Sequence, residues 1–187
     1  MGTAYGNRAT GVDACLDSAY LATHEGTKTE PSKVAPPGYL WGKAHAGYLG
    51  LDSSKSINIC HLLGKDLSGS GTDLKNLATC SRQANTNVTG VGRIDEHMYH
   101  YEEQVKDAID GGRVVRYTVT PRYVGSRTVP VSFEMTARGI RPDGSPGVSF
   151  TQVVPNSICS PRQGQWKNLG TVTDSRTGIP VPTGPMK

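Results

Sequence analysis

A histidine and two asparagines in the segment from Ser56 to Asn85 are the residues of this chain best suited to chemistry. His61 ends a short apolar run, a Gly/Ser turn follows, and Asn76 and Asn85 then stand nine positions apart. An imidazole accepts a proton near neutral pH, because its unperturbed pKa is roughly 6.5, and a carboxamide oxygen can bind a hard cation. This combination predicts metal-assisted hydrolysis of a phosphodiester.

The chemistry of phosphodiesters explains why these residue types would be needed. The attacking oxygen must approach an anion, and the leaving oxygen departs as an alkoxide. A general base removes the proton of the attacking water, and a divalent cation neutralises the charge on the phosphoryl and leaving oxygens. We therefore expect His61 to be neutral, on a strand, and close to an Asn-held Mg²⁺ without binding it.

Each residue also has a plain structural interpretation. A lone histidine is more often a satisfied structural residue, and a lone asparagine more often a helix cap or turn residue. The glycine-rich run S-G-S-G that ends at Gly71 is no phosphate-binding P-loop, because no G-K-[ST] follows it.

The hydrophobic pattern predicts the elements that position these residues. A short strand is expected over Ile57–Leu63, and Asp73 can cap the turn that leads to Asn76. Residues 86–95 read as a flexible insertion. A helix with apolar residues at helical spacing starts near Met98 and ends at Gly111-Gly112. Glu102 and Lys106 are four apart on it, where the plain interpretation is an ordinary ion pair.

The second half of the chain predicts an antiparallel meander. Period-2 alternation indicates strands over residues 115–120, 129–138 and 148–154, joined by short Gly-containing turns. Near the N-terminus, apolar residues between Val12 and Thr23 fall at helical spacing and predict a short amphipathic helix. Residues 30–38 are expected to form a Pro-rich loop.

Charge is unevenly distributed along the chain. The net charge is +4; residues 1–110 hold 10 Lys/Arg against 13 Asp/Glu, and residues 111–187 hold 10 against 3. An arginine-rich half can line a groove for a polyanion, or it can be a solvated sheet face. No run of apolar residues is long enough for a membrane span, and no signal-peptide pattern follows Met1.

Four cysteines leave several possibilities open. Three disulfide pairings are possible among Cys15, Cys60, Cys80 and Cys159, and the even count favours an oxidising compartment. Free buried cysteines are equally compatible with a domain of 187 residues. A zinc site is disfavoured, because the paired C-x-x-C spacing is absent.

Five motifs together indicate a family. C-H-L-L-G, G-S-G-T-D-L-K-N-L, R-Q-A-N, Y-H-Y-E-E-Q-V-K-D-A-I and V-R-Y-T-V-T-P-R-Y follow one another between Asn58 and Asn156. In order and spacing the segment resembles the DNA/RNA non-specific endonucleases of the ββα-metal (His-Me finger) class, particularly the branch of DNA-entry nucleases and toxin domains. The resemblance implies an α+β fold: a central antiparallel sheet with a ββα-metal motif and flanking helices.

The resemblance also implies a role for each matching residue. His61 matches the general base, Asn85 the asparagine that binds the metal directly, and Asn76 the asparagine that supports the site. Glu102 matches a glutamate that holds metal-bound water. Lys106 matches a basic residue, usually Arg, that steadies phosphate in the transition state or product.

One departure from the family concerns a phosphate contact. The family usually has Arg one or two residues before the histidine, where this chain has Ile59 and Cys60. Arg82 and Arg93 are candidates to replace it, and Arg116 is a further candidate for contact with nucleic acid.

The resulting expectation is one nuclease domain over residues 1–187, with a loosely structured part at 1–55, a ββα-metal core at 56–156 and a tail at 157–187. The resemblance implies an endonuclease that uses Mg²⁺ (or Mn²⁺), cuts DNA and RNA with little sequence preference and leaves 5′-phosphate ends. It also implies a secreted nuclease or a toxin domain with an immunity protein as partner.

Two rival interpretations remain. The first is a module of the same fold that binds nucleic acid without cutting it. The second is a cysteine hydrolase built on Cys60 or Cys80, which is disfavoured because adjacent residues such as Cys60 and His61 point to opposite faces of a strand.

Overall fold

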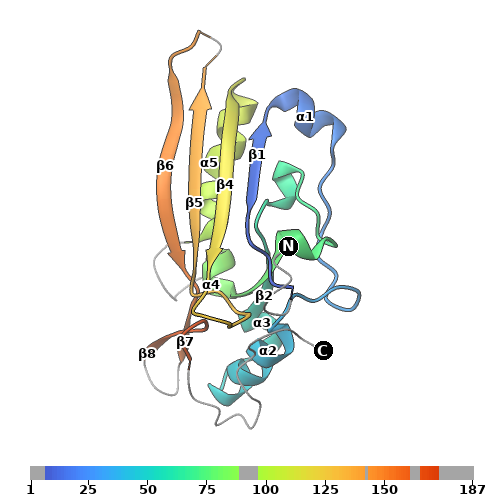
Figure 1. Ribbon diagram of the computed structural model, residues 1–187, viewed down its shortest axis with the longest axis vertical. Coiled ribbons are helices and arrows are strands. Elements are labelled where there is room, and N and C mark those ends of the chain that lie inside the picture. The colour runs from blue at the N-terminus through green and yellow to red at the C-terminus, as the bar shows by residue number, and fades with distance from the viewer. Residues whose placement is uncertain (1–6, 89–96, 142, 161–164, 173–187) are drawn as a thin grey trace.

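A central antiparallel sheet with helices against it forms the body of the molecule. The computed structural model describes residues 7–88, 97–141, 143–160 and 165–172 (Figure 1). The strands are β1 (Val12–Leu16), β2 (Ile57–His61), β3 (Leu77–Ser81), β4 (Val114–Arg122), β5 (Ser132–Ile140), β6 (Pro146–Pro155), β7 (Ser157–Ser160) and β8 (Gln165–Asn168). The α-helices are α1 (Ser18–Thr23), α2 (Tyr39–Tyr48), α3 (Ser53–Ser56), α4 (Arg82–Asn85) and α5 (Met98–Asp110), and 3₁₀ turns occur at Lys65–Leu67 and Leu74–Asn76.

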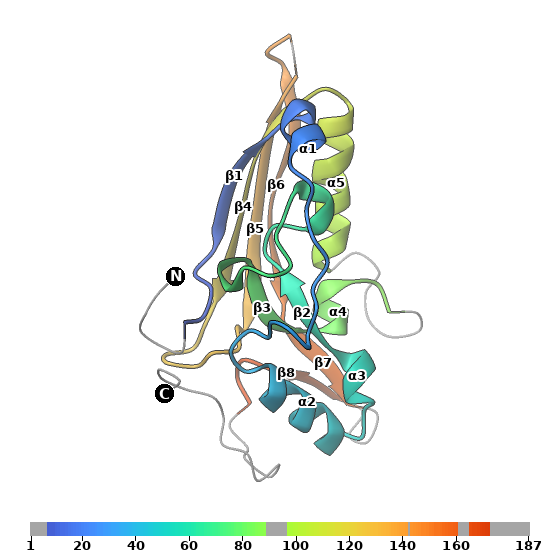
Figure 2. The same cartoon turned by 90° about the vertical axis from the view of Figure 1, so that its right-hand side faces the viewer.

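The four-stranded sheet has the order β1-β4-β5-β6, with every neighbouring pair antiparallel. Along β4, Val115, Tyr117 and Val119 are buried, whereas Arg116 is exposed. This alternation is the predicted one, and the meander β4-β5-β6 is confirmed. Figure 2 shows α5 running along one face of this sheet.

Helix α5 confirms the prediction made from its apolar spacing. It buries Met98, Val105, Ala108 and Ile109 in the core, whereas Glu103, Asp107 and Asp110 are exposed. The helix ends at the two predicted glycines, of which Gly112 has a φ of 79° and so takes the left-handed conformation.

Strands β2 and β3 form a separate antiparallel pair, and α4 follows β3 directly. The predicted strand at Ile57 is confirmed, as is the Asp73 cap, whose carboxylate accepts from the backbone N–H of Lys75 at 2.9 Å. Ser81 caps α4 by accepting from Ala84 N at 3.0 Å. This two-strand and one-helix unit turns Asn85 back toward the end of β2.

A fully buried asparagine joins this unit to the rest of the fold. The Oδ1 of Asn156 accepts from Ser81 N at 2.8 Å, and its Nδ2 donates to the carbonyls of Thr79 at 3.2 Å and Pro130 at 2.8 Å. Because Asn156 immediately follows β6, these bonds connect β3 to the large sheet.

The N-terminal prediction is wrong in two respects. Residues 12–16 form β1, and the predicted helix is limited to α1, because Val12–Leu16 pairs along its whole length with β4. The local pattern of apolar residues fits a helix and a strand alike, and pairing with the distant strand β4 favours the strand. Residues 1–55 were expected to be loosely structured, yet they also contain α2, whose Tyr39 and Trp41 are buried. The Pro-rich loop before α2 is confirmed.

The C-terminal prediction is also corrected. Residues 157–187 were expected to be a tail with little structure, but β7 and β8 pair as a hairpin that adds Ile158 and Leu169 to a second apolar cluster. Residues 173–187 lie outside the described residues, as do residues 89–95 of the insertion predicted at 86–95. Among the helices described, none combines the length and apolar character required to cross a membrane.

Candidate active site

Four of the residues selected from the sequence line one cavity. It has a volume of about 460 Å³ and opens between the end of β2, the turn that follows it, the end of α4 and the side of α5. Its lining residues are His61, Gly64, Lys65, Asp66, Leu67, Asn85, Thr86, Tyr99, Glu102, Glu103, Lys106 and Asp107. The structure therefore brings together His61, Asn85, Glu102 and Lys106, and Figure 2 shows β2 and α4 near the lower end of α5.

His61 is held in one tautomer by the backbone. Its Nε2 lies 2.9 Å from the carbonyl oxygen of Thr27. A carbonyl accepts a hydrogen bond and donates none, so Nε2 carries the proton and Nδ1 keeps a free lone pair. Burial lowers the pKa of His61 below its ordinary value, although the Thr27 bond and the charge of Asp66 act in the opposite direction. The ring is thus neutral near pH 7 and can accept a proton at Nδ1.

Thr27 is fixed in turn by the glycine-rich turn. Its N–H donates to Gly69 O at 3.0 Å, and its hydroxyl accepts from Gly71 N at 2.8 Å. At Gly69 a Cβ would lie 1.6 Å from the carbonyl oxygen of Leu63, so this close approach requires glycine. The S-G-S-G run therefore positions the residue that orients His61.

Asn76 does not line the cavity. It is buried beneath the Gly-rich turn, where its Oδ1 accepts from Leu63 N at 2.8 Å. Its Nδ2 donates to the carbonyls of Leu63 and Ser70, both at 3.0 Å. These bonds hold the chain immediately after His61, so Asn76 acts on the site through the backbone.

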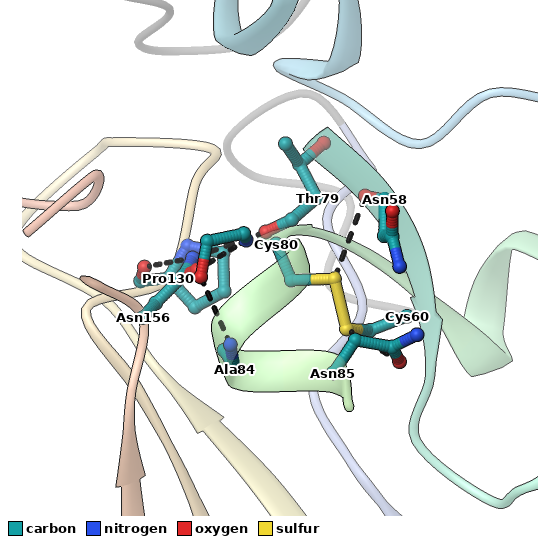
Figure 3. The surroundings of a disulfide bond; sticks show 9 residues. Asn58, Cys60, Thr79, Cys80, Ala84, Asn85, Pro130 and Asn156 are labelled. Carbon is teal, nitrogen blue, oxygen red and sulfur yellow. Dashed lines mark hydrogen bonds between the residues drawn. A yellow bond between two sulfur atoms is a disulfide. The ribbon is translucent and has the colours of Figure 1, made fainter. Parts of the chain in front are cut away.

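Asn85, the last residue of α4, lies against a disulfide. Cys60 and Cys80 are bonded, with their Cα atoms 5.9 Å apart, and the Asn85 Oδ1 is 3.2 Å from the Cys60 sulfur (Figure 3). A disulfide sulfur has no proton, so this contact is not a hydrogen bond. Rotation of the amide away from the sulfur therefore costs no hydrogen bond to the sulfur.

The disulfide decides between the alternatives that the sequence left open. Cys60 and Cys80 are bonded to each other across β2 and β3, and Cys15 and Cys159 are free. Neither a zinc site nor a thiol nucleophile can be built on two bonded sulfurs, which excludes the cysteine hydrolase on Cys60 or Cys80.

Glu102 has an unusual environment for a carboxylate. Its oxygens lie against Gly64, where a Cβ would approach them to 2.7 Å. Burial, followed by repulsion from Asp66, raises the pKa of Glu102 to about 8. Within the described part of the chain, no hydrogen bond or ion pair satisfies this group. A carboxylate in this position becomes more stable when a cation enters the cavity.

Lys106 pairs with a different residue from the expected one. Its Nζ lies 2.5 and 2.6 Å from the two carboxylate oxygens of Asp110, one turn further along α5. The ordinary ion pair between Glu102 and Lys106 is therefore not formed. Lys106 still lines the cavity, but part of its charge is already neutralised.

Two of the three arginines proposed for nucleic acid, Arg82 and Arg116, do not line the cavity. Arg82 is exposed on α4. Arg116 lies on the sheet face opposite to buried Tyr117, in a bidentate pair with Asp13 at 3.0 and 2.7 Å. Arg93 lies outside the described residues. The structure thus separates Arg116 from the site.

Sequence reasoning missed several residues of the site. Thr27 comes from a distant segment, and no local pattern marks it. Lys65 and Asp66 stand shortly after His61, and a search for charged residues next to the predicted turn would have found them. Tyr99 and Glu103 are neighbours of Glu102 on α5.

The donor atoms around the cavity fit a hard divalent cation. Across the part of the chain that the structure describes, no group of three or more His, Cys, Asp or Glu side chains could hold a metal ion. The oxygen donors in the lining include the Asn85 carboxamide and the Glu102 carboxyl group, with the Asp66 carboxylate close by. Such a cation keeps several water ligands, as Mg²⁺ does.

Comparison with solved structures shows the same fold in nucleases. The chain is similar to Sda1 nuclease with bound zinc (21% identity, TM-score 0.60, 81% of this chain and 71% of that chain). It is also similar to NucA from Streptococcus agalactiae with magnesium bound (19% identity, TM-score 0.58, 87% and 73%). An extracellular endonuclease matches at 19% identity, with a TM-score of 0.54 over 86% and 80% of the two chains.

The sequence itself matches a family model. No curated protein matches the chain. The family model of the DNA/RNA non-specific endonucleases matches residues 3–139, which is well over half of the chain. The chain therefore belongs to the DNA/RNA non-specific endonuclease family and is a nuclease.

Proposed function

We propose that this nuclease cuts DNA and RNA with a divalent cation, preferably Mg²⁺ (or Mn²⁺), with His61 as general base and Asn85 as metal ligand. The observation that carries the proposal is the convergence of a neutral imidazole, a carboxamide and an unpaired carboxyl group on one cavity. Each of the three comes from a different element: β2, α4 and α5.

The residues divide the work of hydrolysis. His61 accepts the proton of the attacking water at Nδ1, while Thr27 holds the opposite nitrogen. Asn85 would hold the cation directly, and Glu102 would hold it through water. When bound, the cation would neutralise the charge that develops on the phosphoryl and leaving oxygens. Lys106 contributes a weaker contact to phosphate, because Asp110 already pairs with it.

The solved structures support the choice of metal and compartment. NucA was solved with magnesium and Sda1 with zinc, and two further matches are an extracellular endonuclease and an extracellular nuclease. The disulfide beside the site is also suited to an oxidising compartment. We infer a secreted or exported nuclease. As a toxin domain it would have an immunity protein as partner.

Little sequence preference is expected. Contacts to backbone phosphate carry no sequence information, and the site offers a base, a cation and lysines rather than groups that read base edges. Phosphate is common to DNA and RNA, so both are expected to be cut, leaving 5′-phosphate ends.

Cleavage of supercoiled plasmid and of a labelled RNA by the purified chain tests this proposal. With Mg²⁺ the parent should cut both, and EDTA should stop it. His61→Ala and Asn85→Ala should each lower the rate by about 10²-fold or more, because a general base alone contributes 10²–10⁴-fold. His100→Ala and Asn87→Ala, whose side chains do not line the cavity, serve as matched controls and should cut like the parent.

Two outcomes would contradict the proposal. If His61→Ala and Asn85→Ala cut as fast as the controls, the site is assigned to the wrong residues. If the parent shifts plasmid in a gel but leaves it supercoiled with Mg²⁺ or Mn²⁺, the domain is a nucleic-acid-binding module.

A further inference from the structure

The catalytic cavity is the middle of three adjoining cavities. A second cavity, of about 430 Å³, shares His61, Lys65 and Asn85 with it. A third, of about 410 Å³, shares Lys65, Asp66 and Lys106 with it. Because Lys65 lines all three, this residue lies where the cavities meet.

The three cavities differ in charge. The catalytic cavity and the third cavity both contain carboxylates, among them Asp66. The second cavity is lined by Lys28 and Lys65 together with neutral polar and apolar side chains, and it has no Asp or Glu in its lining. We call it the acid-free cavity. Its charge is suited to an anion that extends from the catalytic centre.

Lys65 has an ammonium group that is available for such an anion. Three other lysines are held in ion pairs: Lys106 with Asp110, Lys55 with Asp52 and Lys33 with Glu30. Within the described residues no ion pair forms at Lys65 or Lys28.

The backbone at Lys65 is held in position. Its carbonyl oxygen accepts from Ser68 N at 3.0 Å, which closes the 3₁₀ turn after β2. Gly26 packs so closely that a Cβ there would lie 2.1 Å from the same oxygen. The Lys65 side chain therefore starts from a fixed point a few residues beyond the general base.

We propose that the acid-free cavity binds the backbone phosphates of the nucleic-acid strand on one side of the cleaved bond, through Lys65 next to the reacting phosphate and Lys28 further along. Lys65 then supplies the cationic contact that the chain lacks at Ile59 and Cys60. This inference rests on the proposed function, since it takes His61 and Asn85 as the point of cleavage.

The test measures binding separately from cutting. Fluorescence anisotropy with a labelled single-stranded oligonucleotide, as DNA and as RNA, gives the affinity of His61→Ala protein between 50 and 200 mM salt in Mg²⁺. Each lost phosphate contact lowers the slope of log K against log[salt] by about 0.7 for a single strand. In that background Lys65→Gln should lower the slope by about 0.7, and Lys28→Gln with Lys65→Gln by about 1.4.

Two control substitutions separate charge from folding. Lys75→Gln removes an exposed lysine that lines none of the three cavities, and it should leave the slope unchanged. Lys65→Arg keeps the charge and should keep the slope. DNA and RNA should respond equally, because the contact is to phosphate. In the parent background Lys65→Gln should raise KM by several-fold and change kcat less.

The inference is overturned if Lys65→Gln and Lys75→Gln give the same slope of log K against log[salt]. It is also overturned if Lys65→Arg lowers this slope as much as Lys65→Gln does. That result leaves the nuclease proposal standing as long as the parent cuts plasmid. Conversely, the slope could change as predicted although the parent protein does not cut plasmid. That result would support the phosphate site and contradict the proposed nuclease mechanism.

Discussion

Two titratable groups of the catalytic cavity have pKa values shifted by burial. Burial lowers the pKa of His61, so the imidazole stays neutral and able to accept a proton. Burial also raises the pKa of Glu102 to about 8, so without a cation the carboxyl group is protonated at pH 7. The same desolvation thus prepares the base and leaves the carboxylate in need of a positive charge.

Glu102 predicts a pH-dependent stability of the metal-free protein. Its pKa is about 8 in the folded chain against an ordinary 4.5, so the folded state binds the proton more tightly. The stabilisation is complete below pH 4.5 and is lost as the pH rises toward 8. Glu102→Gln carries no charge, so in EDTA its Tm should exceed that of the parent increasingly from pH 5 to 8, by roughly 10 °C at the upper end.

Glu103→Gln is the matched control, because Glu103 is exposed on the same helix. Calorimetric scans should show no growing difference for it. A difference between Glu102→Gln and the parent that stays constant across this pH range would show that Glu102 is ionised at neutral pH.

An isosteric substitution of Asn76 should lower the free energy of unfolding. Asn76→Asp keeps the shape but removes the two hydrogen bonds donated to the carbonyls of Leu63 and Ser70. The loss of buried partners should lower the free energy of unfolding by about 2–4 kcal/mol. Urea denaturation measures it, with exposed Asn87→Asp as control; equal stability of the two variants would mean that Asn76 does not hold this turn.

Among the elements, those with a clear period were predictable from the sequence. Helix α5 and strands β4 and β5 each bury one face, and β6 partly buries Val148, Phe150 and Val154 on one face, which leaves a period of 3.6 or 2 in the apolar residues. Strand β1 was not predictable in this way, because its five residues fit a helical spacing equally well and pairing with β4 decides their state. Strands β7 and β8 are too short to carry a pattern.

The disulfide is the element-level link between the proposed base, His61, and the proposed metal ligand, Asn85. It joins β2 to β3 directly beside His61, and Cys60 contacts Asn85. The double variant Cys60→Ala/Cys80→Ala should lose about 3 kcal/mol of unfolding free energy, as expected for a loop of about this length. Its cleavage rate should also fall, because Asn85 loses the sulfur against which it packs.

Cys15→Ala/Cys159→Ala removes the two free thiols and should leave stability and rate nearly unchanged. Thiol titration of the denatured parent should find two free thiols before reduction and four after it, given one disulfide and two free cysteines. Four thiols before reduction would contradict the pairing.

For the whole molecule, the site depends on contacts that no local pattern reveals. The bond from His61 to Thr27 spans 34 positions, and the bonds of Asn156 to β3 span 75 and 77. Four residues named from the sequence do line one cavity, because short motifs fix their types and spacing. The Thr27 carbonyl, the choice of disulfide and the acid-free cavity arise from how distant segments pack.

The central claim is that His61 and Asn85 act together at one cation on one phosphate. A double-mutant cycle of the plasmid cleavage rate with Mg²⁺ tests it most directly, by comparing His61→Ala, Asn85→Ala and the double variant with the parent. Residues that act as a unit are not additive, so the double variant should be hardly slower than the slower single variant. If the fold-loss of cleavage rate in the double variant instead equals the product of the two single fold-losses, His61 and Asn85 act independently. That result would contradict the shared site.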